Sequence, residues 1–449
     1  MNRLSFSIIN ASGNYKLQII FKGLSGNSVQ PFLKSIFLYF YNPQRDFIYS
    51  ILSMAYSKTT KLDLSNLCFS PEKGITLNEK LTDCYRQFTE NKQNSFQKSS
   101  IVKQTIFISI SNNSEYLLRK EELLVCTQDF FDELPLTSII AQSPDNVSLA
   151  VEFICIPGLQ SDEVSHKKND ETSWLVIQRN HMKMVFAVGA GDASESDDIF
   201  RQSDSAFRQL NNILEEEGMD FSNVIRQWNY IEQITKTVNY DHSPSQHYQI
   251  FNDVRSKYYR QASFKNGFPA ATGIGMDFGG IIIDMIAVKF GDEGSVVAIK
   301  SPVQLDAYSY SKEVLADNNL MKDFCKTTPK FERAKILITS GNNCIFISGT
   351  AAITGQASLQ QSCPETQTEM TIQNILCLIS TDNLQKHGII TNEKASISFL
   401  RVYVKYPKDI EAVRSVCLKY FSQIPISFVV ADICRPELLV EIEGQAELI

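Results

Sequence analysis

The sequence predicts an α+β protein in which one folding unit occurs twice, in tandem, between about residue 170 and residue 449. Two observations support this fold class. The same order of strand-like and helix-like segments recurs at an offset of about 160 residues. Within each copy the apolar residues switch between the period of a strand and that of a helix. A mixed β-sheet with two helices on one face accounts for the pattern.

The first copy begins near Trp174 and the second near Lys335. Each opens with an apolar run that ends in glycine, at Gly189 and at Gly349, and we expect each run to be a strand that enters a tight turn. A helix with one apolar stripe follows in each copy. The stripe residues are Phe207, Leu210 and Leu214 in the first copy, and Ile372, Ile375, Leu376 and Ile379 in the second.

The second half of each copy repeats the same elements. Strand-like segments at 224–231 and 397–404 precede a second amphipathic helix, which ends in paired aromatic residues in both copies. Proline then introduces two further strand-like runs, and we expect these to form a β-hairpin at 269–288 and another at 425–443.

The region before residue 170 is harder to assign. Strand-like runs occur at 16–21, 36–41, 105–110 and 148–156, so some α/β structure is expected there. The polar segments 92–100 and 162–172 are candidate linkers, and 311–329 is a candidate excursion between the two copies. We therefore expect an N-terminal region at 1–170, a first unit at 171–299 and a second unit at 300–449.

Composition and motifs exclude several function classes. A net charge of −7 without a basic run argues against nucleic-acid binding. The apolar runs are too short to cross a membrane, and polar residues interrupt any N-terminal signal core, so a cytoplasmic protein is expected. The ten cysteines form no CxxC pair, which argues against a metal site or disulfide framework. The glycines at 273–280 do not match a nucleotide-binding loop, and hydrolase or kinase motifs are absent.

The last hairpin carries the most specific signal. Side chains alternate along a strand, so Glu441 and Glu443 are expected to share one face. From the pattern alone, a solvated sheet face is the more economical interpretation.

The stretch ADICRPELLVEIEG, residues 431–444, resembles the C-terminal signature of chorismatases, a branch of the Rid (YjgF-like) superfamily. The resemblance covers about 270 residues and implies tandem Rid-like, or chorismate mutase-like, units. It also implies an enzyme that cleaves the enolpyruvyl ether of chorismate without a cofactor, giving pyruvate and 3- or 4-hydroxybenzoate. Further segments match in the same order, at 226–231, 248–255, 268–271, 304–310, 331–334 and 346–352.

The resemblance assigns roles to particular residues. Glu441 matches the carboxylic acid that protonates the methylene carbon, a role that burial would favour because it raises the pKa of a glutamate. Chorismate is a dianion, and Arg333 and Arg435 would bind its carboxylates in a planar, two-pronged geometry. Cys434 lies seven residues before Glu441, as in the hydroxybenzoate-forming members. Tyr308, Thr350 and Ala351 are the remaining expected substrate contacts.

Departures from the family pattern leave alternatives open. The stretch Ser301-Pro-Val-Gln304 lacks the arginine usually present there, so a non-catalytic ligand-binding protein is one alternative. An imine or enamine deaminase is the other, although the arginine it needs is absent near Ile426. In the first copy the position matching Glu441 falls near Asp284 with no Cys-Arg pair before it, so a single active site is expected. Monomer and homotrimer both fit.

Overall fold

The computed structural model describes strands at 3–11 and 14–22, and residues 63–449 except 91–100, 180, 192–197, 241–242, 292, 312–326, 340–342, 390 and 392. The chain divides into two compact units, Met1–Thr59 and Thr60–Ile449. In the first unit β1 (Arg3–Ala11) pairs with β2 (Asn14–Lys22) as an antiparallel hairpin, which confirms the strand predicted at 16–21. The strand predicted at 36–41 lies outside the described residues.

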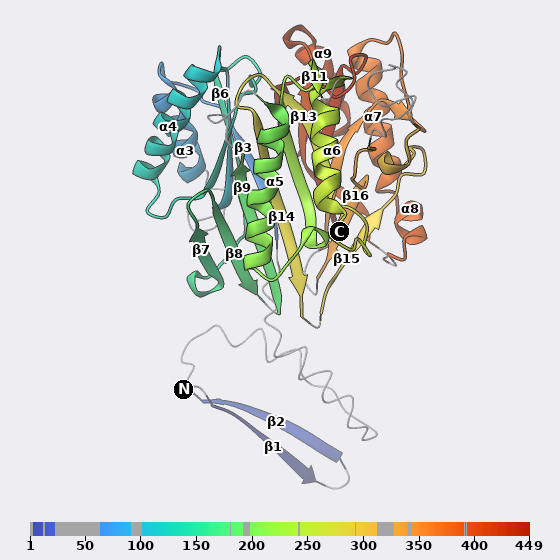
Figure 1. Cartoon of the computed structure of the whole chain (residues 1–449). Helices are drawn as coiled ribbons and strands as arrows, with labels where there is room; N and C mark the ends of the chain where they lie inside the picture. The colour runs from blue at the N-terminus through green and yellow to red at the C-terminus, as the bar shows by residue number, and fades with distance from the viewer. Residues whose placement is uncertain are drawn as a thin grey trace. The chain divides into compact units, whose positions relative to one another are not determined.

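Three mixed sheets with attached helices form the described part of the second unit (Figure 1). The first has the order β3-β6-β4-β5 and carries α3 and α4. Its elements are β3 (Ser65–Phe69), α3 (Leu77–Glu90), β4 (Ile101–Ile108), α4 (Asn113–Phe130), β5 (Leu136–Ile140) and β6 (Leu149–Cys155).

The second sheet has the order β13-β10-β14-β9-β8-β7 and carries α5 and α6. Its elements are β7 (Val164–Lys168), β8 (Ser173–Arg179), β9 (Met182–Ala190), α5 (Ile199–Glu216), β10 (Val224–Glu232), α6 (His247–Tyr259), β13 (Ala270–Met276) and β14 (Ile281–Phe290), with the small pair β11 (Thr237–Tyr240) and β12 (Ser243–Gln246) before α6.

The third sheet has the order β15-β16-β17-β22-β20-β21 and carries α7, α8 and α9. Its elements are β15 (Ser295–Ile299), β16 (Ala334–Ile338), β17 (Cys344–Ala351), α7 (Pro364–Leu378), α8 (Thr381–Lys386), β20 (Ala395–Val404), α9 (Ile410–Tyr420), β21 (Ile426–Val430) and β22 (Val440–Leu448), with the small pair β18 (Ile353–Thr354) and β19 (Ala357–Ser358) after β17.

The three sheets share one topology. In each, four strands and two helices follow the chain order strand, helix, strand, helix, strand, strand. The second of these strands pairs in parallel with the third and antiparallel with the fourth, and the fourth pairs antiparallel with the first. The expected duplication is therefore confirmed, and the poorly assigned N-terminal region holds a third example between 65 and 155.

Three sequence predictions were wrong. The runs at 269–288 and 425–443 are not hairpins, because β10 lies between β13 and β14 and β20 lies between β21 and β22. Gly189 and Gly349 lie inside strands β9 and β17 rather than at turns. Segment 162–172, predicted as a candidate loop or linker, contains edge strand β7. The alternation that identifies a strand does not say which strand lies beside it.

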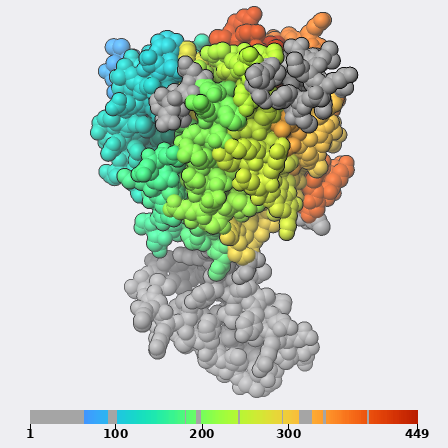
Figure 2. Space-filling view, viewed as in Figure 1, coloured from blue at the N-terminus to red at the C-terminus, as the bar shows by residue number. Residues whose placement is uncertain are grey.

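The helices and sheets divide the interior into layers. In β14, Ile281, Ile283 and Met285 pack under α5 and α6, while Ile282 and Ile286 face the other way, into a core shared by all three sheets. The predicted apolar stripes of α5 and α7 lie in these helix-to-sheet cores, which confirms them. Figure 1 shows α5 and α6 lying in front of the second sheet, and Figure 2 shows the outer face of the molecule on this side. No helix among the described residues is long and apolar enough to cross a membrane.

Candidate active site

Glu441 lies on β22, on the sheet face opposite α7 and α9. Val440 and Ile442 pack into the helix-covered core, whereas Glu441 and Glu443 face the space between the sheets. Glu441 is 5% exposed and Glu443 is 2% exposed. The two carboxylates therefore share a face, as the alternation predicted, and that face is buried rather than solvated.

The absence of a side chain on Gly349 makes room for the carboxyl group of Glu441. A Cβ atom on Gly349 would lie 2.0 Å from Oε1 of Glu441. The pairing of β17 with β22 is irregular here, between Ile347 and Thr350. The Gly349 amide donates a 3.1 Å hydrogen bond to Oγ1 of Thr272 on β13. Glycine is needed at position 349 because the Glu441 carboxyl group lies where a side chain would begin. The position of Gly349 at the end of an apolar run did not reveal this contact.

Burial and a neighbouring charge keep Glu441 protonated near neutral pH. Burial raises the pKa of Glu441 to about 8, and the charge of Glu443 adds to this, whereas Arg226 and Arg333 act against it. Burial would also raise the pKa of Glu443, but Arg226 and Arg401 outweigh burial and lower it below its ordinary value. Two carboxyl groups on one strand thus take different protonation states.

Two arginines meet at Tyr310 beside Glu441. Arg333 is buried, and its Nη2 donates to the hydroxyl of Tyr310 at 2.6 Å and to the carbonyl of Leu305 at 2.5 Å. The guanidinium of Arg435 lies 5.2 Å from the centre of the Tyr310 ring. Its Nη1 donates to Oγ of Ser358 at 2.9 Å. The predicted pair of arginines is therefore brought together, with Tyr310 between them.

Tyr248, on α6 of the second sheet, and Cys434, in the segment between β21 and β22 of the third, both lie near Glu441. Burial, followed by the charge of Glu441, raises the pKa of the Cys434 thiol to about 12, so the thiol is neutral at pH 7. Burial also raises the pKa of Tyr248 on α6, and both Cys434 and Glu441 contribute. The Tyr248 ring lies against Gly273, where a Cβ atom would be 3.0 Å from Cε2.

Sequence reasoning assigned no role to α6 in this site. Tyr248, Asn252 and Arg255 lie at i, i+4 and i+7 of the helix, which places them on one face. Arg255 is buried, donates to Oδ1 of Asn252 and interacts with Tyr248. Its Nε has no hydrogen-bond partner among the described residues. The helical spacing of three polar residues within a matched segment could have identified them.

The other predicted contacts are distributed differently. The hydroxyl of Tyr308 lies 3.0 Å from Oδ2 of Asp306 and 3.4 Å from Oε2 of Glu332, and these carboxylates share its one proton. The tyrosine that accepts a hydrogen bond from Arg333 is Tyr310. Thr350 donates to the carbonyl of Ser348 at 2.9 Å. Ala351 pairs in register with Glu441 and is buried beside it.

The position that matches Glu441 in the first copy, predicted near Asp284 within 281–285, is Ile282. The pairing of β9 with β14 is irregular opposite Asp284, as the pairing of β17 with β22 is irregular opposite Glu443. Asp284 therefore corresponds to Glu443, and Ile282 takes the place of Glu441. Asp284 accepts hydrogen bonds from Ser138 and the Gly189 amide, and it pairs with Lys103 at 3.0 Å. The sequence pattern placed the match only near Asp284, because the irregular pairing of these strands leaves no trace in the pattern.

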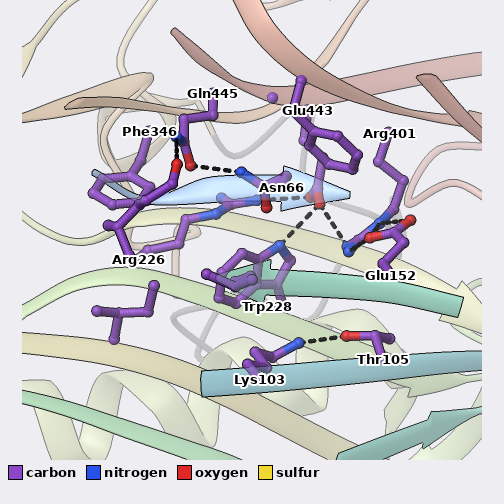
Figure 3. Close-up of a pocket in the computed structure, with 15 residues that line it drawn as sticks. Asn66, Lys103, Thr105, Glu152, Arg226, Trp228, Phe346, Arg401, Glu443 and Gln445 are labelled. Atoms are coloured by element: carbon purple, nitrogen blue, oxygen red, sulfur yellow. Dashed lines mark hydrogen bonds and ion pairs between the residues drawn. The ribbon is translucent and has the colours of Figure 1, made fainter. Parts of the chain in front are cut away.

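A polar pocket lies where the three sheets meet, and Glu443, two residues along β22 from Glu441, lines it (Figure 3). Glu443 accepts a hydrogen bond from Nη2 of Arg226 at 2.7 Å, from Nη1 of Arg401 at 2.7 Å and from Nε1 of Trp228 at 2.8 Å. Arg401 also pairs with Glu152 of the first sheet. All three sheets thus contribute charged groups to one buried network.

Comparisons with known proteins agree with this geometry. The model of a family described as "Chorismatase FkbO/Hyg5-like, N-terminal" matches residues 160–287. A 3-hydroxybenzoate synthase of Streptomyces hygroscopicus is 33% identical over 248 residues, which cover 54% of this chain and 67% of that protein. A chorismatase of Streptomyces rapamycinicus is 34% identical over 180 residues, 39% of this chain and 50% of that one. The chain is similar in fold to a crystal structure of chorismatase, with a TM-score of 0.61 and 21% identity over 86% of this chain and 99% of that one.

Proposed function

The chain belongs to the chorismatase family, and on that premise we propose that it cleaves the enolpyruvyl ether of chorismate to pyruvate and 3- or 4-hydroxybenzoate. The observation that carries the proposal is the buried carboxyl group of Glu441, whose pKa is raised to about 8 by burial and by Glu443. A carboxyl group that is still protonated near pH 7 is what proton transfer to carbon requires.

Glu441 acts as the general acid. It donates its proton to the methylene carbon of the enolpyruvyl group, and positive charge then develops on the carbon that bears the ether oxygen. The carboxylate left behind stabilises that cation in a site with little water, where an electrostatic interaction is stronger than in bulk solvent. The bond between the ring and the ether oxygen then breaks, so that this oxygen leaves as the carbonyl oxygen of pyruvate. Loss of a ring proton gives the hydroxybenzoate, and no water, metal or organic cofactor is consumed in the proposed reaction.

Arginines bind the two carboxylates of the substrate. Arg333 and Arg435 converge on Tyr310 from the third sheet, and Arg255 approaches from α6 of the second sheet. Guanidinium groups match carboxylates with two parallel hydrogen bonds. Three buried or half-buried arginines therefore offset the repulsion that an acidic protein exerts on a dianion.

Cys434 controls the product. Its thiol is neutral and lies beside Glu441, so it can contact the ring during loss of the side chain. The name of the Streptomyces hygroscopicus relative makes 3-hydroxybenzoate the first product to look for. The proposal extends to a cytoplasmic enzyme, active as a monomer or a homotrimer, with the dianionic substrate as its partner.

The test is incubation of the purified protein with chorismate, with pyruvate measured by a coupled assay and aromatic products by chromatography. Glu441→Gln should abolish turnover. Glu447→Gln is the matched control, because Glu447 lies on the same face of β22, about 20 Å further along the strand. It should retain activity.

Three other outcomes would change the proposal. Release of a non-aromatic diol with pyruvate would remove the role given to Cys434. Ammonia release from an imine, with no reaction of chorismate, would favour a deaminase. No turnover by the folded protein would contradict the chorismatase activity and favour a protein that only binds its ligand.

A further inference from the structure

We propose that Glu443, held ionised by Arg226, Arg401 and Trp228, is a positioning residue that keeps the carboxyl group of Glu441 protonated in the resting enzyme. The inference rests on the proposed function, because it explains how the general acid retains the proton it must donate. It assigns a catalytic purpose to a network that does not itself touch the substrate.

The contacts of Glu443 commit it to the ionised form. Both of its oxygens accept hydrogen bonds from charged donors, with Oε2 bound to Arg226 and Oε1 bound to Arg401, each at 2.7 Å. The indole Nε1 of Trp228 is a third donor, at 2.8 Å. A protonated carboxyl group would have to give up one of these charge-assisted bonds, so the proton is excluded from Glu443.

The fixed charge of Glu443 lies next to Glu441. Residues two apart on a strand point to the same face, about 7 Å apart along the chain. Both side chains are buried, so solvent screens their repulsion poorly. Because Glu443 holds the negative charge, ionisation of Glu441 would place a second one beside it.

Arg226 lowers the pKa of Glu441 through its charge, but the hydrogen bonds of its guanidinium go to other groups. Its Nη2 is shared between Glu443 and Oγ1 of Thr272, which lies 2.8 Å away. Its Nη1 is buried without a hydrogen-bond partner in the described part of the chain. Arg226 therefore weakens the effect of Glu443 on Glu441 but does not form an ion pair with Glu441.

The other groups that face Glu441 are accounted for element by element. Arg333 supplies a positive charge from the segment before β16, and Cys434 and Tyr248 are neutral because burial raises the pKa of each. Tyr403 of β20 pairs in register with Glu441, and burial raises the pKa of its hydroxyl as well. Glu443, Arg226 and Arg333 are thus the charges that set the protonation of Glu441.

The first sheet completes the network, as Figure 3 shows. Arg401 binds Glu152 through Nε at 3.0 Å and through Nη2, while its Nη1 binds Glu443. Glu152 thereby fixes the guanidinium that holds Glu443. This contact gives the N-terminal sheet, which contributes none of the residues of the proposed active site, an indirect part in catalysis.

The experiment compares the pH dependence of kcat/KM with chorismate in Glu443→Gln and Arg226→Gln. Activity requires protonated Glu441 and so falls as the pH rises through its pKa, about 8 in the unmodified protein. Glu443→Gln removes the repelling charge. The falling limb, which is the pH range over which kcat/KM decreases as Glu441 ionises, should move to lower pH by about one unit or more. Arg226→Gln removes an attracting charge, and the limb should move to higher pH.

Two further variants separate this effect from general damage. Glu443→Asp keeps the charge and should return the limb towards its original position. Glu217→Gln is the matched control, because Glu217 is also a buried carboxylate held by two cations and an indole, namely Lys167, Lys183 and Trp174. It should leave the limb unchanged. A structural role would lower the rate without moving the limb in opposite directions.

A readout without turnover keeps the inference testable if chorismate is not the substrate. The infrared carbonyl band of the neutral Glu441 carboxyl, obtained by subtracting the spectrum of Glu441→Gln, should disappear at lower pH in Glu443→Gln than in the unmodified protein. Absence of pyruvate release with this shift present would contradict only the proposed function. An unchanged band and limb in folded Glu443→Gln would overturn the role of Glu443.

Discussion

At the scale of single residues, Glu441 combines a chemical role with a cost in stability. Its pKa is raised from 4.5 in the unfolded chain to about 8 in the folded protein by burial and by Glu443. At a pH between these two pKa values, Glu441 is protonated in the folded state and ionised in the unfolded state. The free energy of unfolding therefore falls as the pH rises from about 4.5 to about 8.

Glu441→Gln should remove this pH dependence. The variant should gain stability relative to the unmodified protein as the pH rises, by on the order of 2 to 4 kcal/mol at pH 8. Denaturant unfolding at pH 5 and pH 8 measures the difference. Glu216→Gln, at an exposed position of α5, is the control and should show no such trend. Equal stability of Glu441→Gln and the unmodified protein at both pH values would contradict the burial of a neutral Glu441.

Gly349 is the second residue on which the site depends. Gly349→Ala would bring Cβ to 2.0 Å from the Glu441 carboxyl group, so Glu441 must leave its position. We expect kcat to fall at least about tenfold and the free energy of unfolding to fall by about 1 to 3 kcal/mol. A double-mutant cycle of unfolding free energies with Glu441→Ala is the measurement, because removal of the carboxyl group should relieve most of the loss of stability. Additive effects would show that the clash lies elsewhere.

At the scale of elements, the junction of β13 with β17 holds the active site together. Oγ1 of Thr272 accepts hydrogen bonds from the Gly349 amide at 3.1 Å and from Arg226 at 2.8 Å, and thus ties the second sheet to the third. One hydroxyl group fixes both the strand beside Glu441 and the arginine that binds Glu443.

Thr272→Val should weaken both connections. The shape of the side chain is preserved, but two buried donors lose their acceptor, which should cost about 1 to 3 kcal/mol of stability and lower kcat more than it raises KM. Steady-state kinetics and denaturant unfolding measure these effects. Thr272→Ser retains the hydroxyl and should behave like the unmodified protein. A Val variant with unchanged kcat would show that the junction is not needed for alignment.

The elements themselves were the part of the fold that sequence could predict. Period-3.6 stripes identified α5 and α7, because each of these helices buries one face against a sheet, and strand-like composition identified β10 and β20, which are buried on both faces. The prediction of two hairpins was wrong. β10 lies between β13 and β14, and β20 lies between β21 and β22, and this pairing depends on tertiary packing that the local sequence does not show. Glu441 and the two arginines came from a family resemblance. Gly349 was wrongly expected at a turn, because irregular strand pairing leaves no trace in the pattern.

At the scale of the whole molecule, three sheets of one topology place equivalent positions around a common centre. Glu152, Asp284 and Glu443 each lie on the fourth strand of a sheet, opposite Thr105, Trp228 and Arg401 respectively on the second. Two residues earlier on the same face of each fourth strand lie Ala150 in the first sheet, Ile282 in the second and Glu441 in the third. A carboxyl group at this position is therefore present in the third sheet alone among the three. The third repeat escaped detection because α4 exposes Leu118 and Val125 and so lacks a clear apolar stripe.

Loss of the Arg401 side chain should lower the free energy of unfolding, because Arg401 connects two of the sheets. It joins Glu152 of the first sheet to Glu443 of the third, and all three side chains are buried. Arg401→Met would leave two buried carboxylates without this partner, and removing one member of a buried ion pair typically costs about 3 to 5 kcal/mol. Denaturant unfolding should show that loss as a lower midpoint. The double variant Arg401→Met/Glu152→Gln should recover part of it, because one uncompensated charge is gone. If the double variant is no more stable than Arg401→Met, Glu152 does not act through Arg401, and the first sheet is not coupled to Glu443 by this route.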